Sequence, residues 1–277
     1  MNKEELLSLL NSHDLSPNKS LGQNFLVDDA VVDRIIEAVN PEKNEAILEI
    51  GPGIGAVTEA LSRKSDSVDA VEIDSGLASL LKQTYRDNKK INIIHSDFLK
   101  INHEDKYAKI VSNLPYYCSS EILFTIAENY SASKIFVMLQ GEMAERIASR
   151  PGSPSYGALT ITLGLYYKPK LLFKTGRFSF YPVPDVSSSF LLLERKENIA
   201  ISGETFLAFQ KIVKSAFWGR RKTIAKALTD SPHISYEKKT VLEVLESCGI
   251  NPQTRGEELD RECFIKLAEK FQVLSGV

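Results

Sequence analysis

Four consecutive residues, Asn113-Leu114-Pro115-Tyr116, have the chemistry needed to hold an aromatic amine for group transfer. Such an amine is a poor nucleophile because its lone pair is delocalised into the ring. The Asn113 side-chain oxygen and the Leu114 backbone carbonyl can each accept one amine proton, which favours a pyramidal nitrogen. Pro115 removes a donor and stiffens the loop, and Tyr116 offers a face on which an extruded base can stack. The four residues also suit an ordinary turn, so their context must decide.

A glycine-rich segment earlier in the chain, Gly51-Pro52-Gly53-Ile54-Gly55, has the composition of a ligand-binding turn. It follows an apolar strand pattern and precedes a helix, and glycines there let the backbone turn tightly and approach a ligand. Glu72 ends the next strand roughly 20 residues later, where a carboxylate can accept both hydroxyl protons of a ribose. Asp97 ends the third strand, so we expect it beside the same crevice.

Three interpretations of these glycines compete. A dinucleotide would need G-x-G-x-x-G to seat its pyrophosphate, whereas the spacing here is G-P-G-I-G and Glu49 precedes the first glycine. S-adenosylmethionine has no phosphate and fits acidic surroundings better: its ribose would bind Glu72, its adenine amine Asp97, and its charged methionine end the backbone near Gly51. A turn without a ligand would leave both acids unexplained. Together with Asn113, the motifs predict methyl transfer to an amine, in which orientation provides most of the catalysis.

The elements that position these motifs are short β-branched runs that alternate with helical patterns between roughly residues 45 and 140. This alternation predicts βαβ units and a parallel sheet covered on both faces. The expected strands are EAILEIG, VDAVEID, INIIHSD, AKIVSN and KIFVMLQ, and the expected helices cover residues 56–64, 76–88 and 119–130. LLFKTGRFSF and SSFLLLER, on either side of a proline-rich turn, predict a final antiparallel pair at the sheet edge.

The strand patterns stop after Arg195. Residues from about 204 to the end have helical spacing, with Gly249 as a C-cap. We therefore expect a catalytic α/β domain over residues 1–198 and a smaller all-helical domain over residues 199–277. The first residues, MNKEELLSLLNSHDLSP, predict a short amphipathic helix and not a signal peptide.

Composition bounds the possible functions. The chain has 277 residues, of which 43% are hydrophobic and 25% charged, as in an ordinary globular protein. No apolar run approaches the roughly 20 residues of a membrane helix, so we expect a cytoplasmic protein without a membrane partner. Three widely spaced cysteines and four histidines without i, i+4 pairing predict neither a disulfide framework nor a metal site.

The charge distribution is uneven. The formal net charge of −2 argues mildly against a nucleic-acid partner. One segment, however, has six basic residues and no acidic residue: Lys211, Lys214, Arg220, Arg221, Lys222 and Lys226. A solvated basic helix face and an RNA-contacting face are equally compatible with this run.

Five motifs taken together resemble the KsgA/RsmA family of rRNA adenine N6,N6-dimethyltransferases. N-[LI]-P-[YF] after the fourth strand is typical of enzymes that methylate exocyclic amines of nucleobases, and four further segments match family patterns in the right order along the whole chain. They are Gly22–Leu26 (GQNFL), Phe180–Ser188 (FYPVPDVSS), Ala216–Thr223 (AFWGRRKT) and Arg255–Leu259 (RGEEL). One departure is Tyr117-Cys118, where the family commonly has Asn-Ile; Cys118 fits a small buried hydrophobe better than a nucleophile.

The resemblance implies further roles and a substrate. It implies a Rossmann-like class I S-adenosylmethionine-dependent fold with a mostly parallel seven-stranded sheet. Asn24 and Leu26 would contact the cofactor, and Phe180 would be the second aromatic wall of the adenine pocket. The substrate would be two adjacent adenines in the 3′-terminal hairpin loop of small-subunit (16S) rRNA, each dimethylated during ribosome assembly. The helical domain would bind this RNA, with Arg220, Arg221 and Lys222 as its contacts.

Two alternatives remain at this point. An erythromycin-resistance methyltransferase of large-subunit rRNA would share the chemistry, although such enzymes usually have N-I-P and generally lack the A-F-x-x-R-R-K segment. A non-catalytic assembly or transcription factor would keep the fold only to bind nucleic acid, but Glu72, Asp97 and Asn113 are all present. We further expect a monomer that uses no metal.

Overall fold

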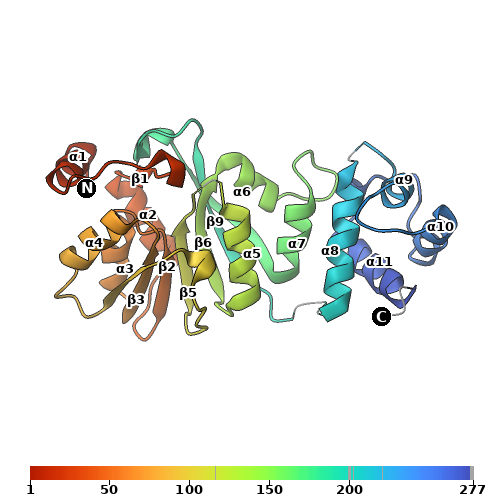
Figure 1. The fold of residues 1–277 in the computed structure, drawn as a ribbon, viewed down its shortest axis with the longest axis horizontal. Helices are drawn as coiled ribbons and strands as arrows, with labels where there is room; N and C mark the ends of the chain where they lie inside the picture. Colours follow the sequence, from red (N-terminus) through yellow and green to blue (C-terminus); the bar gives the residue numbers. More distant parts are fainter. Residues whose placement is uncertain (116, 199–200, 202, 220, 275–277) are drawn as a thin grey trace. The chain divides into compact units, whose positions relative to one another are not determined.

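The computed structural model of the protein describes residues 1–115, 117–198, 201, 203–219 and 221–274. These residues form two compact units (Figure 1). Residues 1–144 and 169–195 make up the first, here called the sheet unit. Residues 145–168 and 196–277 make up the second, here called the helical unit. Each unit is described by itself.

A seven-stranded sheet forms the centre of the sheet unit, in the order β4-β3-β2-β5-β6-β9-β7. The five strands predicted between residues 45 and 140 are all present and pair in parallel, so the expected mostly parallel sheet is confirmed. The strands of this sheet are β2 (Ala46–Ile50), β3 (Ser67–Glu72), β4 (Ile91–His95), β5 (Lys109–Asn113), β6 (Lys134–Gln140), β7 (Tyr167–Thr175) and β9 (Ser188–Arg195).

The last two strands complete the sheet at one side. β9 pairs antiparallel with β6, and β7 lies beyond it as the edge strand. β7 begins at Tyr167, before the predicted start at Leu171, and follows directly on helix α7 (Ala158–Tyr166). Sequence periodicity did not indicate α7, because seven consecutive residues, 160–166, are all buried. A helix that is buried all round has no polar face to reveal its period.

A second, two-stranded sheet connects distant parts of the sheet unit. β1 (Phe25–Leu26) pairs antiparallel with β8 (Phe180–Tyr181), with Leu26 opposite Phe180. Two segments singled out in the sequence, GQNFL and FYPVPDVSS, therefore lie side by side.

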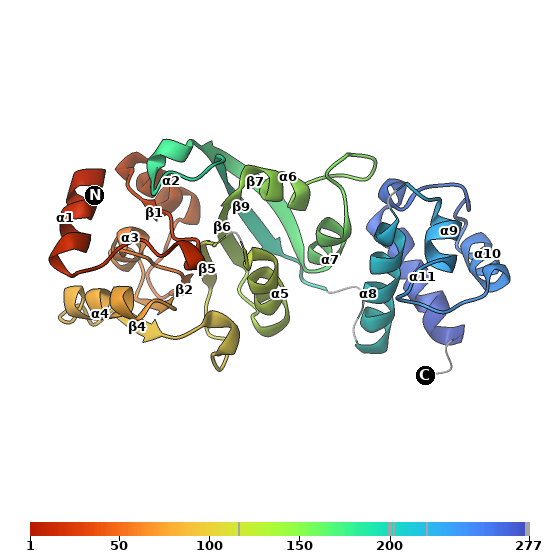
Figure 2. The same cartoon turned by 45° about the horizontal axis from the view of Figure 1, so that its top comes forward.

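Helices cover both faces of the large sheet. On one face, α2 (Asp29–Val39) and α3 (Ala56–Ser62) pack on β2, β3, β5, β6 and β9, and α4 (Ser75–Thr84) packs on β3 and β4. Alternate residues on the opposite face, such as Ile110 and Val137, are equally buried. Figures 1 and 2 show α5 (Ser119–Asn129) beside that face. α6 (Gly141–Ile147) follows β6 directly.

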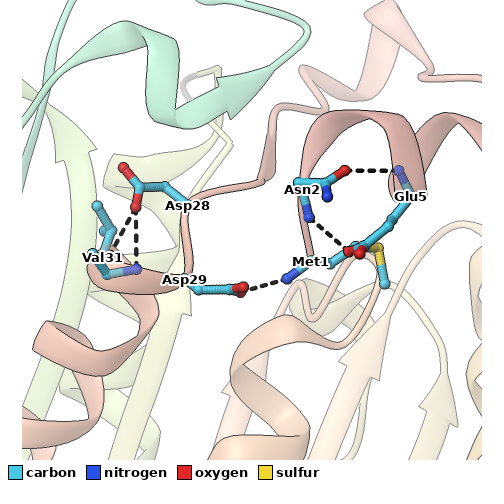
Figure 3. Close-up of polar contacts among 7 residues, drawn as sticks. Met1, Asn2, Glu5, Asp28, Asp29 and Val31 are labelled. Carbon is cyan, nitrogen blue, oxygen red and sulfur yellow. Dashed lines mark hydrogen bonds and ion pairs between the residues drawn. The ribbon is translucent and has the colours of Figure 1, made fainter.

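The predicted N-terminal helix is present as α1 (Lys3–Ser12). Its start is fixed by a capping box, in which the Asn2 side chain accepts from the Glu5 N–H at 3.0 Å and Glu5 accepts from the Asn2 N–H at 2.9 Å (Figure 3). The Met1 ammonium pairs with Asp29 at the start of α2. The apolar face of α1, with Leu6 and Leu10 almost fully buried, packs on residues of β1, the glycine-rich turn and α4.

The helical unit is built on its own aromatic core. Phe217 contacts Tyr156 and Phe264 at ring-centroid distances of 6.4 and 6.1 Å, and the Tyr236 and Phe271 rings lie 4.6 Å apart in a tilted arrangement. The helices of this unit are α7, α8 (Gly203–Trp218), α9 (Ile224–Thr229), α10 (Lys238–Ser247) and α11 (Arg261–Leu274). Residues 145–168 belong to this unit although the expected helical domain began at residue 199. The assignment of an RNA-binding role to residues 199–277 stays a prediction.

None of the helices in the part of the chain that the structure describes is both long enough and apolar enough to cross a membrane.

Candidate active site

One cavity in the sheet unit lies at the carboxyl ends of β2, β3 and β5 and has a volume of about 1000 Å³ including its opening. Most of the residues predicted as catalytic or cofactor-binding line it. Those residues are Asn24, Leu26, Gly51, Glu72, Asn113, Leu114, Pro115 and Phe180.

Strand register explains why these motifs meet. Ile50 at the end of β2 lies opposite Val71 of β3 on one side and Ser112 of β5 on the other. The next residue along each strand is Gly51, Glu72 or Asn113, so the two polar side chains flank the glycine turn. Parallel strands bring their carboxyl ends to one edge of a sheet, which is where ligands bind in open α/β folds.

The glycine-rich turn depends on residues without a side chain. Gly51, Gly53 and Gly55 all have positive φ, at +71°, +59° and +84°. A Cβ on Gly53 would lie 3.1 Å from the Phe25 ring, and one on Gly55 would lie 2.5 Å from the Tyr85 hydroxyl oxygen. The turn is therefore both left-handed and closely packed, as expected from its composition.

Glu72 is buried at the end of β3, with 4% of its surface exposed. Its carboxylate accepts hydrogen bonds from the backbone N–H groups of Gly53 at 3.1 Å and Asp74 at 2.9 Å. Burial raises the pKa of Glu72, and these two hydrogen bonds oppose the rise. The carboxylate is thus held in one orientation in the cavity wall, where it can accept further hydrogen bonds from a ligand.

Glu49 is a second buried carboxyl group in the cavity lining, and the sequence interpretation did not assign it a contact. Among the described residues, none donates a hydrogen bond to its Oε2 atom. Burial raises the pKa of Glu49 to about 7, and the charge of Glu72 contributes to the increase. Two carboxyl groups at one cavity favour a cationic ligand. The signal in the sequence was an acid near a strand end, two residues before the first glycine.

Asn113 ends β5 with its side chain at the cavity and exposed. Its Nδ2 atom donates to the Asn24 backbone carbonyl at 3.1 Å. Because the nitrogen is used in this bond, the amide oxygen is oriented away from it. The Leu114 N–H donates to the Met138 carbonyl at 3.2 Å, and the Ser119 hydroxyl donates to the Pro115 carbonyl at 2.7 Å. Residues 113–115, which belong to the loop predicted to be catalytic and here called the catalytic loop, are therefore tethered to three other segments.

Leu26 and Phe180 of the β1–β8 pair line the cavity together with Asn24, which directly precedes β1. The Asn24 side chain donates to the Gly22 carbonyl at 3.0 Å, which fixes the turn before β1. Phe180 is only 2% exposed and packs in the core with Phe190. An aromatic ring held so firmly can serve as a flat wall for a base.

Asp97 is the predicted cofactor residue that does not line this cavity. It follows β4, next to β3, as expected. Its Oδ1 atom accepts from the Leu99 N–H at 3.0 Å, and its Oδ2 atom lies 3.3 Å from the Lys100 ammonium. Its contact with the adenine of a cofactor stays a prediction. Tyr116, the predicted stacking residue, lies outside the described residues.

The predicted RNA-binding residues lie in the helical unit, between α8 and α9. Arg220 lies outside the described residues, and Arg221 is exposed. Lys222 is already engaged: its ammonium lies 2.9 Å from an Asp230 oxygen and 4.4 Å from the centroid of the Trp218 ring. The other lysines of the basic run are exposed.

A longer acid-free segment escaped the sequence interpretation. Residues 146–184 contain six basic and no acidic residues. Within the sheet unit this segment presents three exposed cations, Lys170, Lys174 and Arg177, on and after the edge strand β7. Counting charges along the whole chain, and not only in the most basic helix, would have found it.

The residues that the structure describes contain no group of three or more His, Cys, Asp or Glu side chains placed to hold a metal ion. That the protein uses no metal stays a prediction.

Comparison with known proteins places these features in one family. The family described as "Ribosomal RNA adenine dimethylase" matches residues 15–272. The chain is 38% identical to a protein of Geobacter metallireducens named "Ribosomal RNA small subunit methyltransferase A", over 93% of this chain and 96% of that protein. It is 36% identical to a Streptococcus sanguinis protein of the same name, over 96% and 95% of the two chains.

Solved structures agree with this assignment. A dimethyladenosine transferase from Plasmodium falciparum superposes with a TM-score of 0.80 at 25% identity, covering 91% of this chain and 98% of that one. The 23S rRNA methyltransferase ErmE superposes with a TM-score of 0.68 at 25% identity, covering 89% and 99%. The expected fold class is therefore confirmed.

Proposed function

We propose which adenines this chain modifies and how, starting from its membership of the ribosomal RNA adenine dimethylase family. It transfers methyl groups from S-adenosylmethionine to the N6 amines of two adjacent adenines in the 3′-terminal hairpin loop of 16S rRNA. The products are N6,N6-dimethyladenosines formed during ribosome assembly. The observation that carries the proposal is the Asn113 amide, tethered by Asn24 in the same cavity as Glu72.

The cavity residues fit S-adenosylmethionine. Glu72 accepts from the ribose hydroxyls, and the left-handed glycine turn at Gly51 and Gly53 leaves room for the ligand to approach the backbone. Glu49, buried with an oxygen that accepts no hydrogen bond from the described residues, suits the positively charged methionine end. The bound cofactor supplies a methyl group on a positively charged sulfur, so the amine needs orientation more than activation.

The catalytic loop provides that orientation. The Asn113 Oδ1 atom and the Leu114 carbonyl each accept one proton of the adenine amine, which localises the nitrogen lone pair and aims it at the methyl group. Phe180 forms a rigid wall against the extruded base. As the nitrogen–carbon bond forms, the sulfur–methyl bond breaks and its electron pair stays on the sulfur, which becomes a neutral thioether. One amine proton then leaves to solvent, and one of the two acceptors holds the remaining proton of the monomethylated amine for the second transfer.

The small subunit is the proposed target for two reasons. The curated relatives that match this chain almost end to end are named small-subunit methyltransferases. The dimethyladenosine transferase also superposes better than the 23S rRNA enzyme, with TM-scores of 0.80 and 0.68. Arg221 and the exposed lysines of the basic run, Lys211, Lys214 and Lys226, provide cations for phosphate contacts, which position the RNA without reading its sequence. The large-subunit enzyme is the alternative outcome of the test.

A subunit-level assay tests the proposal. Purified small and large subunits that lack these modifications are incubated with the enzyme and methyl-labelled S-adenosylmethionine, and the RNA is digested to nucleosides. We expect label in N6,N6-dimethyladenosine from the small subunit. Label confined to large-subunit RNA, to another base or to protein would overturn the proposal. The proposal includes a monomer in the cytoplasm, which sedimentation of the purified protein and cell fractionation check.

A further inference from the structure

Tyr117 lies at the mouth of the cavity and has no role in the chemistry described above. It follows the catalytic loop, and 62% of its surface is exposed. Its ring lies against Gly22: a Cβ placed on Gly22 would be 3.7 Å from the Tyr117 Cδ1 atom and 3.8 Å from the Pro115 Cβ atom. Gly22 and Pro115 both line the cavity. The ring therefore lies beside the cavity rim, and most of the residue is exposed.

The support under this ring is rigid. Gly22 has a left-handed backbone, with φ at +61°, and its N–H donates to the Lys19 carbonyl at 3.1 Å. The Gly22 carbonyl accepts from the Asn24 side chain, and the next residue, Gln23, donates to Asp74 at 3.1 Å. A side chain at position 22 would be strained by the left-handed backbone, although its Cβ would meet the ring only at an ordinary van der Waals distance. The segment beside Tyr117 is fixed by its own hydrogen bonds and leaves the ring exposed.

An exposed aromatic ring at this place has an obvious physical use. An enzyme that modifies a base must extrude it from the stack, which leaves the neighbouring base without one of its stacking partners. Stacking on a protein aromatic ring offsets this loss and tolerates any base, because every base has a π-face. Phe180 is buried within the cavity and serves the extruded base, whereas the Tyr117 ring lies outside the lining and is free to meet the next one.

We propose that Tyr117 is a positioning residue for the RNA substrate, whose ring stacks on the base beside the extruded adenine. This inference rests on the proposed function. A ring on one side of the cavity meets the neighbour on one side of the extruded base, so the base on Tyr117 is the other target adenine during one of the two modifications and a flanking base during the other. The ring therefore helps to set the register of the RNA at the cavity, and it makes no contact with the transferred methyl group.

The test compares Tyr117→Ala and Tyr117→Phe with the wild-type enzyme on unmethylated small subunits. Removal of the ring is expected to lower kcat/KM for subunits about ten-fold, within the range measured for loss of one aromatic–base stack, mainly through a higher KM. Tyr117→Phe keeps the ring and should stay within about two-fold. Affinity for S-adenosylmethionine, measured by calorimetry, should not change, which separates RNA positioning from damage to the cavity. Phe178→Ala is the matched control, because Phe178 is an exposed ring of the sheet unit (75%) outside the cavity lining.

The outcomes separate this inference from the function on which it rests. An active wild-type enzyme and an equally active Tyr117→Ala variant would overturn the inference alone. So would a Tyr117→Phe variant as impaired as Tyr117→Ala, because the hydroxyl and not the ring would then matter, or a loss of cofactor affinity in Tyr117→Ala. A wild-type enzyme that leaves adenines of the small subunit unlabelled would overturn the proposed function and this inference with it.

Discussion

The cavity of the sheet unit and the basic segment between α8 and α9 hold their polar groups in different ways. In the cavity, Glu72 and Asn113 are each fixed by backbone groups of other segments, Glu72 by the Gly53 N–H and Asn113 by the Asn24 carbonyl. In the basic segment, Lys222 is held by side chains nearby in the sequence, and Arg221 is exposed. Chemistry needs atoms placed to a fraction of an ångström, whereas phosphate contacts need only charge within reach. Single substitutions should therefore cost far more in the cavity.

The largest effect is expected for Asn113→Ala. It removes one of two acceptors that orient the amine, and loss of one positioned hydrogen-bonding group typically costs about 100- to 1000-fold in kcat. Single-turnover methylation of small subunits measures this, and calorimetry should show nearly unchanged affinity for S-adenosylmethionine. Asn129→Ala is the matched control, because Asn129 is an exposed asparagine at the end of α5. Joint loss of cofactor affinity and turnover in Asn113→Ala would contradict the assigned role.

The next effect is expected for Glu72→Gln. This change keeps the size of the side chain but removes the charge that accepts from the ribose hydroxyls, and charge-assisted hydrogen bonds contribute about 1.5–3 kcal/mol. We expect the Kd of S-adenosylmethionine to rise about 10- to 100-fold by calorimetry. Glu59→Gln, an exposed residue of α3, should leave it unchanged. An unaltered Kd in Glu72→Gln would place the ribose elsewhere.

The raised pKa of Glu49 predicts that the stability of the folded protein depends on pH. Its pKa rises from 4.5 to about 7 on folding, so the folded protein binds more protons between these values and loses stability as the pH rises through this window. Relative to Glu49→Gln, the unliganded wild-type protein should become less stable by up to about 3 kcal/mol between pH 4.5 and 7, measured by urea denaturation.

Affinity for the cationic cofactor should change in the opposite direction, because the ionised Glu49 attracts it. The ratio of wild-type to Glu49→Gln affinities should rise towards pH 7, and titration of the ligand itself cancels in this ratio. A ratio independent of pH would exclude a contact between Glu49 and the charged end of the ligand.

The smallest effects are expected in the basic segment. Arg221→Ala should weaken binding to small subunits several-fold and reduce the slope of log K against log salt by about one charge. Lys222→Ala should change the affinity and the salt slope less, because the Lys222 ammonium is already paired with Asp230. Lys239→Ala, an exposed lysine of α10, is the control. Equal effects of the Arg221 and Lys222 changes would show that the ion pair opens when RNA binds.

Much of the fold and the site could be predicted from short motifs, because strand ends and glycine turns have local signatures. All five parallel strands were identified, and Asn113, Glu72 and Gly51 were expected at one edge of the sheet, where the structure places them. Helix α7 was missed because its buried surface hides its period. Glu49 was seen but not assigned, since only burial gives it an unusual pKa.

The sequence by itself determined which chemistry is available: an amide and a carbonyl for an amine, acids for a cationic nucleoside ligand, and glycines for a left-handed turn. These properties depend on residue type and strand order, both of which are local. Only the tertiary structure decided which groups are free to act. Three contacts depend on how chain segments fold against one another. They are the hydrogen bond from Asn113 to the Asn24 carbonyl, the pairing of Leu26 with Phe180 and the ion pair between Lys222 and Asp230. Such contacts have no periodicity that a sequence can show.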